Sequence, residues 1–196
     1  MQNWVVDIGN TKSAFARIED GELTTRFTVP TSELAEVPFD LMESKCEVVI
    51  ASVVPEATAT LVARLERHEA ITRVIRSADV PLENQYLEIE NLGTDRILAA
   101  YAAYELFGKP QKRDMIVLSL GTATTFECVT KEGVYLGGAI TLGMGSIIEA
   151  VHERTAQLPK VPMDLPKSAI GRTTMESLQS GILNTQLLGV REFTHT

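Results

Sequence analysis

Residues 3–12 read Asn-Trp-Val-Val-Asp-Ile-Gly-Asn-Thr-Lys, a short apolar run that ends in an acid and a glycine turn. The apolar run predicts a buried strand over residues 3–7. Residues 12–18 predict a second strand, and the Asp20-Gly21 pair is a hairpin signal that leads to a third strand over residues 22–28. The chain therefore opens with a three-stranded meander whose first turn contains Gly9.

A second meander of the same kind follows later in the chain. Strands are predicted over residues 115–118, 124–129 and 134–140, with Gly121 in the first turn and Glu132-Gly133 in the second. Gly9 and Gly121 stand 112 residues apart, and Asp20-Gly21 and Glu132-Gly133 stand at the same offset. This pattern indicates an internal duplication, although any two three-stranded meanders share some of these features.

The remaining segments mix helices and strands, which predicts an α/β protein. Apolar periodicity and capping signals predict helices over residues 31–42, 55–68, 94–106, 146–155 and 174–188. Strands are predicted over residues 47–51 and 72–75, and residues 80–92 are polar and irregular.

The composition narrows the class of protein. With 44% hydrophobic residues the chain of 196 residues can form a proper core, and a net charge of -8 makes general nucleic-acid binding a poor expectation. The amino terminus lacks a secretory signal, and no apolar window is long enough for a membrane span, so we expect a cytoplasmic protein. Cys46 and Cys128 lie in no CxxC or Cys/His cluster, which predicts two buried thiols.

The first glycine turn has the chemistry of a phosphate-binding turn. Gly9 lets the backbone approach a ligand closely, and the Asn10 and Thr11 side chains and backbone N–H groups can donate to phosphate oxygens. Asp7 can hold a hydrated Mg²⁺, which uses few protein carboxylates, and Lys12 adds positive charge. A plain hairpin turn is the alternative interpretation.

The second turn strengthens the functional interpretation. Residues 118–125 read Leu-Ser-Leu-Gly-Thr-Ala-Thr-Thr and end an apolar strand with a glycine and several hydroxyls. Two facing turns of this kind clamp a nucleotide triphosphate in the actin-like and sugar-kinase ATPases, which have two related domains with a cleft between them. This analogy concerns the fold and leaves the substrate open.

A third element, Gly93-Thr94-Asp95-Arg96, begins a predicted helix. An acid in the first helical turn is common, because it interacts favourably with the helix dipole. The functional alternative is that Asp95 accepts the proton of an alcohol that attacks a γ-phosphate, since phosphoryl transfer needs one carboxylate to orient the nucleophile.

Seven motifs occur in one order along nearly the whole chain. They are residues 7–11 (DIGNT), 51–55 (ASVVP), 93–96 (GTDR), 121–126 (GTATTF), 137–140 (GGAI), 155–159 (TAQLP) and 171–174 (GRTT). Together they resemble the motifs of the type III pantothenate kinases, a family also represented by a protein described as a Bvg accessory factor.

The resemblance implies duplicated ribonuclease H-like domains with a cleft between them, spanning residues 1–90 and 91–196, the second domain being incomplete. It also implies ATP-dependent phosphorylation of pantothenate to 4'-phosphopantothenate, the first step of coenzyme A biosynthesis. Family members are homodimers that use ATP and Mg²⁺, and many need a monovalent cation, K⁺ or NH₄⁺.

The resemblance also assigns roles to residues, motif by motif. Asp95 would be the general base, and Asp7 would bind Mg²⁺. The ATP phosphates would be bound by Asp7, Gly9, Asn10, Thr11, Lys12, Gly121, Thr122 and Thr124. The pantothenate pocket would be lined by Tyr86, Gly93, Thr94, Arg96 and Thr174.

Three departures from the family pattern bear on function. Ser119 stands where the family has an aspartate linked to the monovalent cation, so K⁺ dependence is in question. Glu88 and Ile89 stand where the family tends to have Asn-Pro near the pocket tyrosine. The chain also stops about fifty residues before the family's usual end, without the late Gly-Gly turn that holds the adenosine. Two alternatives therefore stay open: a non-catalytic relative with a binding or regulatory role, and a kinase for another small alcohol.

Overall fold

The computed structural model describes residues 3–40 and 42–194. The chain divides into two compact units. One comprises Met1–Met115 with Val129–Gly137, and the other comprises Ile116–Cys128 with Gly138–Thr196.

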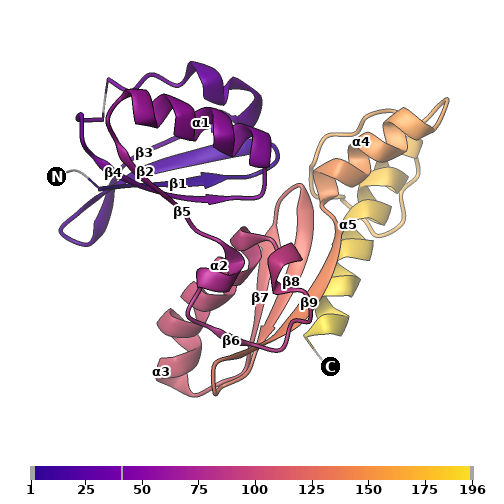
Figure 1. Ribbon diagram of the computed structural model, residues 1–196. Coiled ribbons are helices and arrows are strands. Elements are labelled where there is room, and N and C mark those ends of the chain that lie inside the picture. The colour runs from indigo at the N-terminus through magenta and orange to yellow at the C-terminus, as the bar shows by residue number, and fades with distance from the viewer. Residues whose placement is uncertain (1–2, 41, 195–196) are drawn as a thin grey trace. The chain divides into compact units, whose positions relative to one another are not determined.

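The first unit is built on a five-stranded sheet with the order β3-β2-β1-β4-β5 (Figure 1). The central strand β1 pairs antiparallel with β2 on one side and parallel with β4 on the other. An antiparallel meander extended by parallel strands in this order is the ribonuclease H-like arrangement, so the predicted α/β fold is confirmed. The strands are β1 (Asn3–Ile8), β2 (Lys12–Glu19), β3 (Glu22–Pro30), β4 (Glu47–Ser52) and β5 (Ile71–Val74).

Helix α1 (Pro55–Arg67) covers one face of this sheet (Figure 1). Side chains alternate between the two faces of a strand, so every second residue of β1 points toward the helix. Trp4, Val6 and Ile8 are accordingly almost completely buried, and they share a core with Leu61 and Leu65 of α1.

The helix predicted over residues 31–42 is wrong in its second half. A 3₁₀-helix, η1, spans Thr31–Glu36, and the chain then leaves the helical region at Val37, whose φ is -56° and ψ 122°. Pro38 follows Val37, and the ring of a proline disfavours the helical conformation of the residue before it. Helical periodicity in the sequence therefore overruns the true end of the element.

The helix predicted over residues 94–106 has a more complex end. Helix α2 (Thr94–Ala103) continues into a π-turn, η4 (Tyr104–Gly108), and a short α3 (Lys109–Gln111), which ends at Lys112 in the left-handed conformation. The irregular segment 80–92 contains η3 (Ile89–Asn91) and the two-residue strand β6 (Glu83–Asn84), which pairs in parallel with the start of β9. Between β5 and β6 lies the 3₁₀-helix η2 (Ser77–Asp79).

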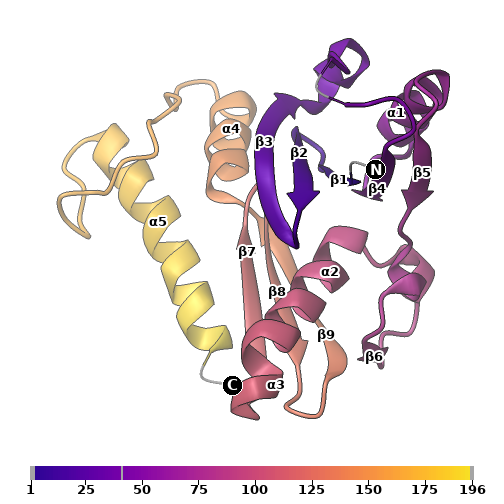
Figure 2. The ribbon, with the colours of Figure 1, turned by 90° about the vertical axis from the view of Figure 1, so that its left-hand side faces the viewer.

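The second unit contains most of the second meander and two helices. The strands are β7 (Met115–Leu120), β8 (Ala123–Val129) and β9 (Val134–Leu142), in a sheet of order β6-β9-β8-β7. This repeats the 3-2-1 order of the first meander, as the duplication predicts. The helices are α4 (Met144–Arg154) and α5 (Thr174–Phe193), which lie side by side in Figure 2.

Helix α5 packs on the second sheet through its side chains. The rings of Phe126 on β8 and Phe193 are stacked with centroids 4.5 Å apart. The Gln186 amide donates to the Leu142 carbonyl oxygen at 3.2 Å. The helix runs five residues past its predicted end, because these contacts extend to its last turn.

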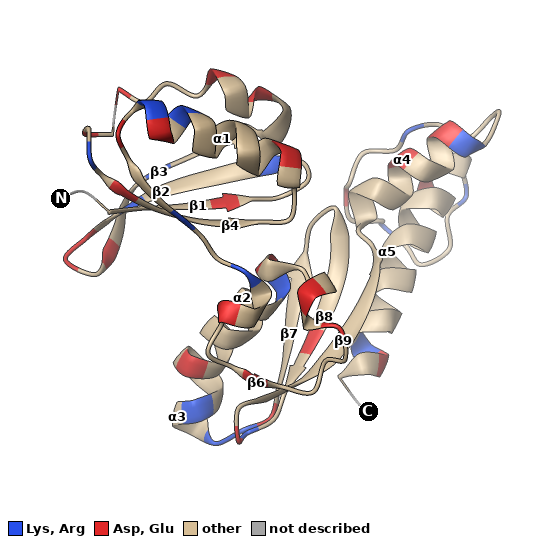
Figure 3. Ribbon diagram, in the orientation of Figure 1, with Lys and Arg blue, Asp and Glu red and all other residues tan. Residues whose placement is uncertain are grey.

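Most charged side chains lie outside the core, but Cys46 and Glu127 are both 0% exposed. Acidic and basic residues are interspersed over both units (Figure 3). Cys46 and Cys128 are free thiols, and Cys128 is only partly buried, which corrects the expectation of two buried thiols. Among the helices of the described residues, none has the length and apolar character needed to cross a bilayer.

The packing of α1 predicts the effect of truncating Leu65, which is 0% exposed. We expect Leu65→Ala to lower the free energy of unfolding by about 2–5 kcal/mol, because it removes buried methyl groups and leaves a cavity. Denaturant titration followed by circular dichroism measures this. The neighbouring Glu66 is exposed, so Glu66→Ala is the matched control and should change stability by about 0.5 kcal/mol at most. Equal effects of the two substitutions would show that α1 does not cover the sheet in this way.

Candidate functional site

The first glycine turn joins β1 to β2 and is closed by its own backbone. The Gly9 N–H donates to the Lys12 carbonyl oxygen at 3.0 Å. A Cβ on Gly9 would approach that oxygen to 3.2 Å, which is tighter than most contacts, so the turn favours glycine. Asn10, Thr11 and Lys12 are all exposed residues.

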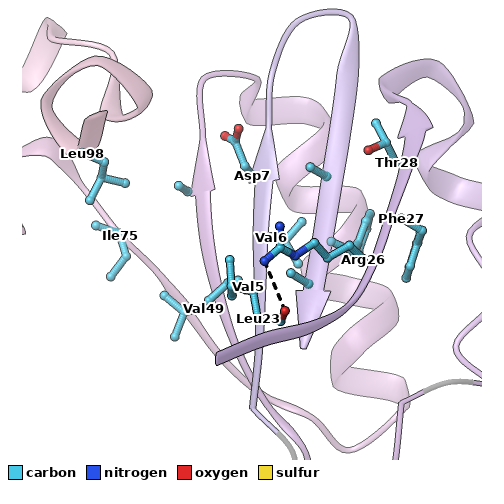
Figure 4. Close-up of a pocket in the computed structure, with 14 residues that line it drawn as sticks. Val5, Val6, Asp7, Leu23, Arg26, Phe27, Thr28, Val49, Ile75 and Leu98 are labelled. Carbon is cyan, nitrogen blue, oxygen red and sulfur yellow. Dashed lines mark hydrogen bonds between the residues drawn. The ribbon is translucent and has the colours of Figure 1, made fainter. Parts of the chain in front are cut away.

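Asp7 lies on the face of the first sheet that α1 does not cover. There it lines an apolar hollow of about 500 Å³ together with Val5, Ala14 and Ala51, and Figure 4 shows it at one end of this hollow. Leu98 of α2 also lines this hollow. Among the described residues that line the hollow, Arg26 is the other charged one, and its guanidinium donates to the Leu23 carbonyl oxygen at 3.2 Å. The rest of the wall around the Asp7 carboxylate is mainly apolar.

The surroundings of Asp7 disfavour its charge. Asp7 is an exposed residue, but the groups around its carboxylate exclude part of the water there. This desolvation, and the negative charge of Asp95, both raise the pKa of Asp7 above its ordinary value of 3.8. Asp7 and Asp95, which are 88 positions apart in the chain, thus lie close enough within the first unit for their charges to interact.

Asp95 is an exposed residue in the first turn of α2, just after the N-cap Gly93. Its Oδ1 accepts a hydrogen bond from the Arg96 N–H at 2.9 Å, which holds the carboxylate over the helix end. A Cβ on Gly93 would lie 2.6 Å from this oxygen and 3.6 Å from Cγ1 of Val53. Gly93 therefore leaves the space that the Asp95 carboxylate occupies.

A buried hydroxyl supports the turn that carries Asp95. Ser77 Oγ donates to the Leu92 carbonyl oxygen at 2.5 Å and lies 3.3 Å from Thr94 Oγ1. Ser77 and Thr94 are both buried. Thr94, a predicted substrate residue, thus has its hydroxyl directed into the protein toward Ser77.

Tyr86 and Arg96, both predicted to line the substrate pocket, meet at Tyr135 of β9. The rings of Tyr86 and Tyr135 have centroids 6.1 Å apart, and Arg96 Nη2 donates to the Tyr135 hydroxyl at 3.4 Å. The Tyr86 ring also lies against Gly137, whose φ of 110° is unfavourable for other residues. The sequence did not indicate Tyr135, which reads as an ordinary strand residue.

The second glycine turn, between β7 and β8, is supported by the start of α4. The Gly121 N–H donates to the Ala123 carbonyl oxygen at 3.0 Å. The Thr122 carbonyl oxygen accepts from the Gly143 N–H at 2.9 Å and from the Ser146 hydroxyl at 2.7 Å. A Cβ on Gly143 would collide with the Gly121 carbonyl oxygen, so only glycine fits at this helix start.

The other predicted residues of the second unit have varied surroundings. Ser119 on β7 is half-buried, and Thr122 is exposed. Thr124 is buried, and its hydroxyl donates to Gln186 Oε1 of α5 at 3.2 Å. Thr174 is the exposed first residue of α5, after Thr173, whose hydroxyl accepts from the Glu176 N–H at 3.2 Å.

A magnesium ion fits the chemistry of Asp7. Across residues 3–40 and 42–194, no three or more His, Cys, Asp or Glu side chains are grouped as metal ligands. Mg²⁺ does not need such a group, because it keeps several waters and binds through one or two carboxylates and substrate phosphates. A cation beside Asp7 would also offset the repulsion from Asp95 that raises the pKa of Asp7.

The family profile and the similar curated proteins agree on one family. A profile described as type III pantothenate kinase matches residues 3–196. A type III pantothenate kinase of Persephonella marina is 35% identical over 192 residues, which cover 90% of this chain and 74% of that protein. The corresponding protein of Thermus thermophilus is 34% identical over 196 residues, with 91% and 75% covered. Among solved structures, an Aquifex aeolicus Ppx/GppA phosphatase aligns with 76% of this chain and 55% of its own at a TM-score of 0.45 and 14% identity.

The raised pKa of Asp7 predicts that its charge costs stability at neutral pH. The folded-state pKa lies above the unfolded value, so protonation favours folding, and stability is lost as the pH rises through the folded-state pKa. We expect Asp7→Asn to raise the melting temperature at pH 7, and to lose this advantage well below pH 3.8, where the carboxyl is protonated in both states. Scanning calorimetry at both pH values measures this. A lower melting temperature of the variant at pH 7 would contradict the assigned environment.

Proposed function

The chain belongs to the type III pantothenate kinase family, and we propose that it transfers the γ-phosphate of ATP to the hydroxyl group of pantothenate. The product is 4'-phosphopantothenate, and the reaction is the first step of coenzyme A biosynthesis. The observation that carries the proposal is the pair of carboxylates Asp7 and Asp95, which the first unit brings close enough for one charge to raise the pKa of the other.

In this proposal the two glycine turns bind the triphosphate. The exposed turn of the first unit contributes Gly9, Asn10, Thr11 and Lys12, and Asp7 holds the divalent metal. The second unit contributes Gly121, Thr122 and Thr124. We propose that the two turns belong to related domains, residues 1–90 and 91–196. Mg²⁺ would neutralise the phosphate charge that develops during transfer.

Asp95 is proposed as the general base. A carboxylate that accepts the substrate proton must be accessible to the substrate and held in a fixed orientation. Asp95 is exposed, and the Arg96 N–H fixes one of its oxygens at 2.9 Å. The presence of this group beside Asp7 favours a catalytic protein over a relative that only binds.

Pantothenate is proposed to bind along the residues that flank Asp95. The guanidinium of Arg96 offers charge for the substrate carboxylate, and Tyr86 lies beside Tyr135, which itself contacts Arg96. Gly93, Thr94 and Thr174 complete the proposed set. Glu88 is exposed. It stands where the family tends to have asparagine, so we propose that it bears on the choice between pantothenate and another small alcohol.

The cation, assembly and location follow from the family as further proposals. Ser119 offers a neutral hydroxyl where the family has a carboxylate, and hard cations bind charged oxygen more tightly. We therefore propose that any K⁺ or NH₄⁺ binds this chain weakly. We also propose a cytoplasmic homodimer.

Replacement of Asp95 tests the proposed function. We expect Asp95→Asn to lower kcat for pantothenate phosphorylation by about 10²–10⁴-fold, because the amide cannot accept the proton. A coupled assay of ADP release measures this, with Mg·ATP affinity measured by calorimetry. The matched control is Asp20→Asn, in an exposed hairpin turn at φ 51°, a conformation that asparagine also tolerates. Absence of pantothenate turnover by the unchanged chain, or equal turnover by Asp95→Asn, would refute the proposal.

Gly93→Ala tests whether the position of the Asp95 carboxylate matters. Gly93 has φ -57°, so alanine fits the backbone, but its Cβ would lie 2.6 Å from Asp95 Oδ1. We expect kcat to fall by about tenfold to a hundredfold, since a catalytic group displaced by about 1 Å loses that much. Steady-state kinetics and the melting temperature are measured together.

Gly181→Ala provides the control for this substitution. Gly181 lies within α5, and no atom lies within 4 Å of the position of a Cβ there. Alanine should stabilise the helix by about 0.5–1 kcal/mol and leave kcat unchanged. Full activity of Gly93→Ala would show that the glycine does not serve the position of Asp95.

A further inference from the structure

We propose that Thr31 is a positioning residue for the first phosphate turn: it holds two carbonyl groups of the turn and thereby aims the turn's N–H groups at the bound nucleotide. The inference rests on the proposed function and adds a residue that none of the seven motifs contains. Thr31 begins η1, directly after β3, and is 22 positions from Gly9 in the chain.

Thr31 contacts the turn at two points. Its hydroxyl donates to the Gly9 carbonyl oxygen at 2.7 Å. Its backbone N–H donates to the Thr11 carbonyl oxygen at 3.0 Å. The carbonyls on both sides of Asn10 are therefore held by one residue that comes from the other side of the meander.

A second hydroxyl fixes the direction of the Thr31 side chain. Ser13 Oγ lies 3.0 Å from Thr31 Oγ1, and Ser13 is 0% exposed. Since the proton of Thr31 is donated to Gly9, Ser13 donates to Thr31. A buried hydroxyl must have a partner, and a loss of this bond would leave Ser13 unsatisfied. The pair therefore holds one rotamer of Thr31.

The geometry of the peptide bond links the hydrogen bonds of Thr31 to the direction of the N–H groups in the turn. A trans peptide is planar, and its C=O and N–H point in opposite directions. The described chain contains no cis peptide bond. When the Gly9 carbonyl points at Thr31, the Asn10 N–H in the same peptide must point away from Thr31. The Thr11 carbonyl directs the Lys12 N–H in the same way.

The resulting turn suits an anion. Successive N–H groups that are fixed in advance bind phosphate oxygens without a cost for ordering them on binding. A turn without the Thr31 hydroxyl would keep its fold, because the Gly9 N–H still donates to the Lys12 carbonyl oxygen. It would lose the fixed direction of the peptide between Gly9 and Asn10.

Two substitutions of Thr31 separate this role from a general structural one. Thr31→Val keeps the shape and removes the hydroxyl, and Thr31→Ser keeps the hydroxyl. We expect Thr31→Val to weaken Mg·ATP binding and to raise KM for ATP by about tenfold, the usual effect of one lost hydrogen bond of this kind. KM for pantothenate should change by less than about twofold, and Thr31→Ser should bind Mg·ATP within about threefold of the unchanged chain.

Three measurements test these expectations. Calorimetry gives the affinity for Mg·ATP, steady-state kinetics give KM for both substrates, and NMR gives the amide signal of Asn10. The Asn10 amide signal should move in Thr31→Val and not in Thr31→Ser. Unchanged Mg·ATP affinity of Thr31→Val overturns the inference, and so does an equal loss in both variants. If the unchanged chain phosphorylates pantothenate while Thr31→Val keeps its ATP affinity, only this inference fails. If the unchanged chain binds no nucleotide, the proposed function fails and the inference fails with it.

Discussion

Strand β1 is hydrogen-bonded on both sides, to β2 and to β4, and its register is fixed along its whole length. Because Trp4, Val6 and Ile8 are buried under α1, the residues between them must point to the opposite face. A slip of one residue would place Asp7 in the core and expose the apolar set. The direction of the Asp7 carboxylate is therefore a consequence of core packing, and the glycine turn that follows is presented at the end of the same strand.

The site that results is electrostatically unfavourable in the absence of a cation. The hollow around Asp7 is lined mainly by apolar residues, and Asp95 adds a second negative charge nearby. Groups whose pKa is shifted by burial and by a like charge are typical of functional sites. A carboxylate with a purely structural role is usually paired with a group of opposite charge. Here the relief is proposed to come from the metal ion of the nucleotide, which links the stability of the free protein to its binding function.

The sequence predicted the local features of this fold well, and the connections between distant segments poorly. The meander strands and the Gly9 and Gly121 turns follow from residues that are neighbours in the chain, so their pattern is visible without a structure. The helix predicted to residue 42 stops at Glu36, since Pro38 opposes the helical conformation of Val37 more strongly than apolar periodicity favours it.

The supporting hydroxyls could not be predicted, because no spacing in the sequence connects them to the turns. Thr31 bonds to a carbonyl 22 positions away, and Ser77 bonds to one 15 positions away. The roles of Asp7 and Asp95 were expected only through the family resemblance. That their charges interact within one compact unit is visible only in the structure, because no spacing in the sequence connects the two residues.

The central claim is that Asp7 is the carboxylate that receives the metal of a bound nucleotide. A ¹³C NMR titration of the Asp7 carboxyl, with and without Mg²⁺ and ATP, tests it most directly. The account predicts a pKa above 3.8 in the free protein, and a pKa that falls when Mg²⁺ and ATP are added together, because the cation stabilises the charged form. A titration curve of Asp7 that is the same in both conditions, at nucleotide concentrations that saturate the protein, would contradict it.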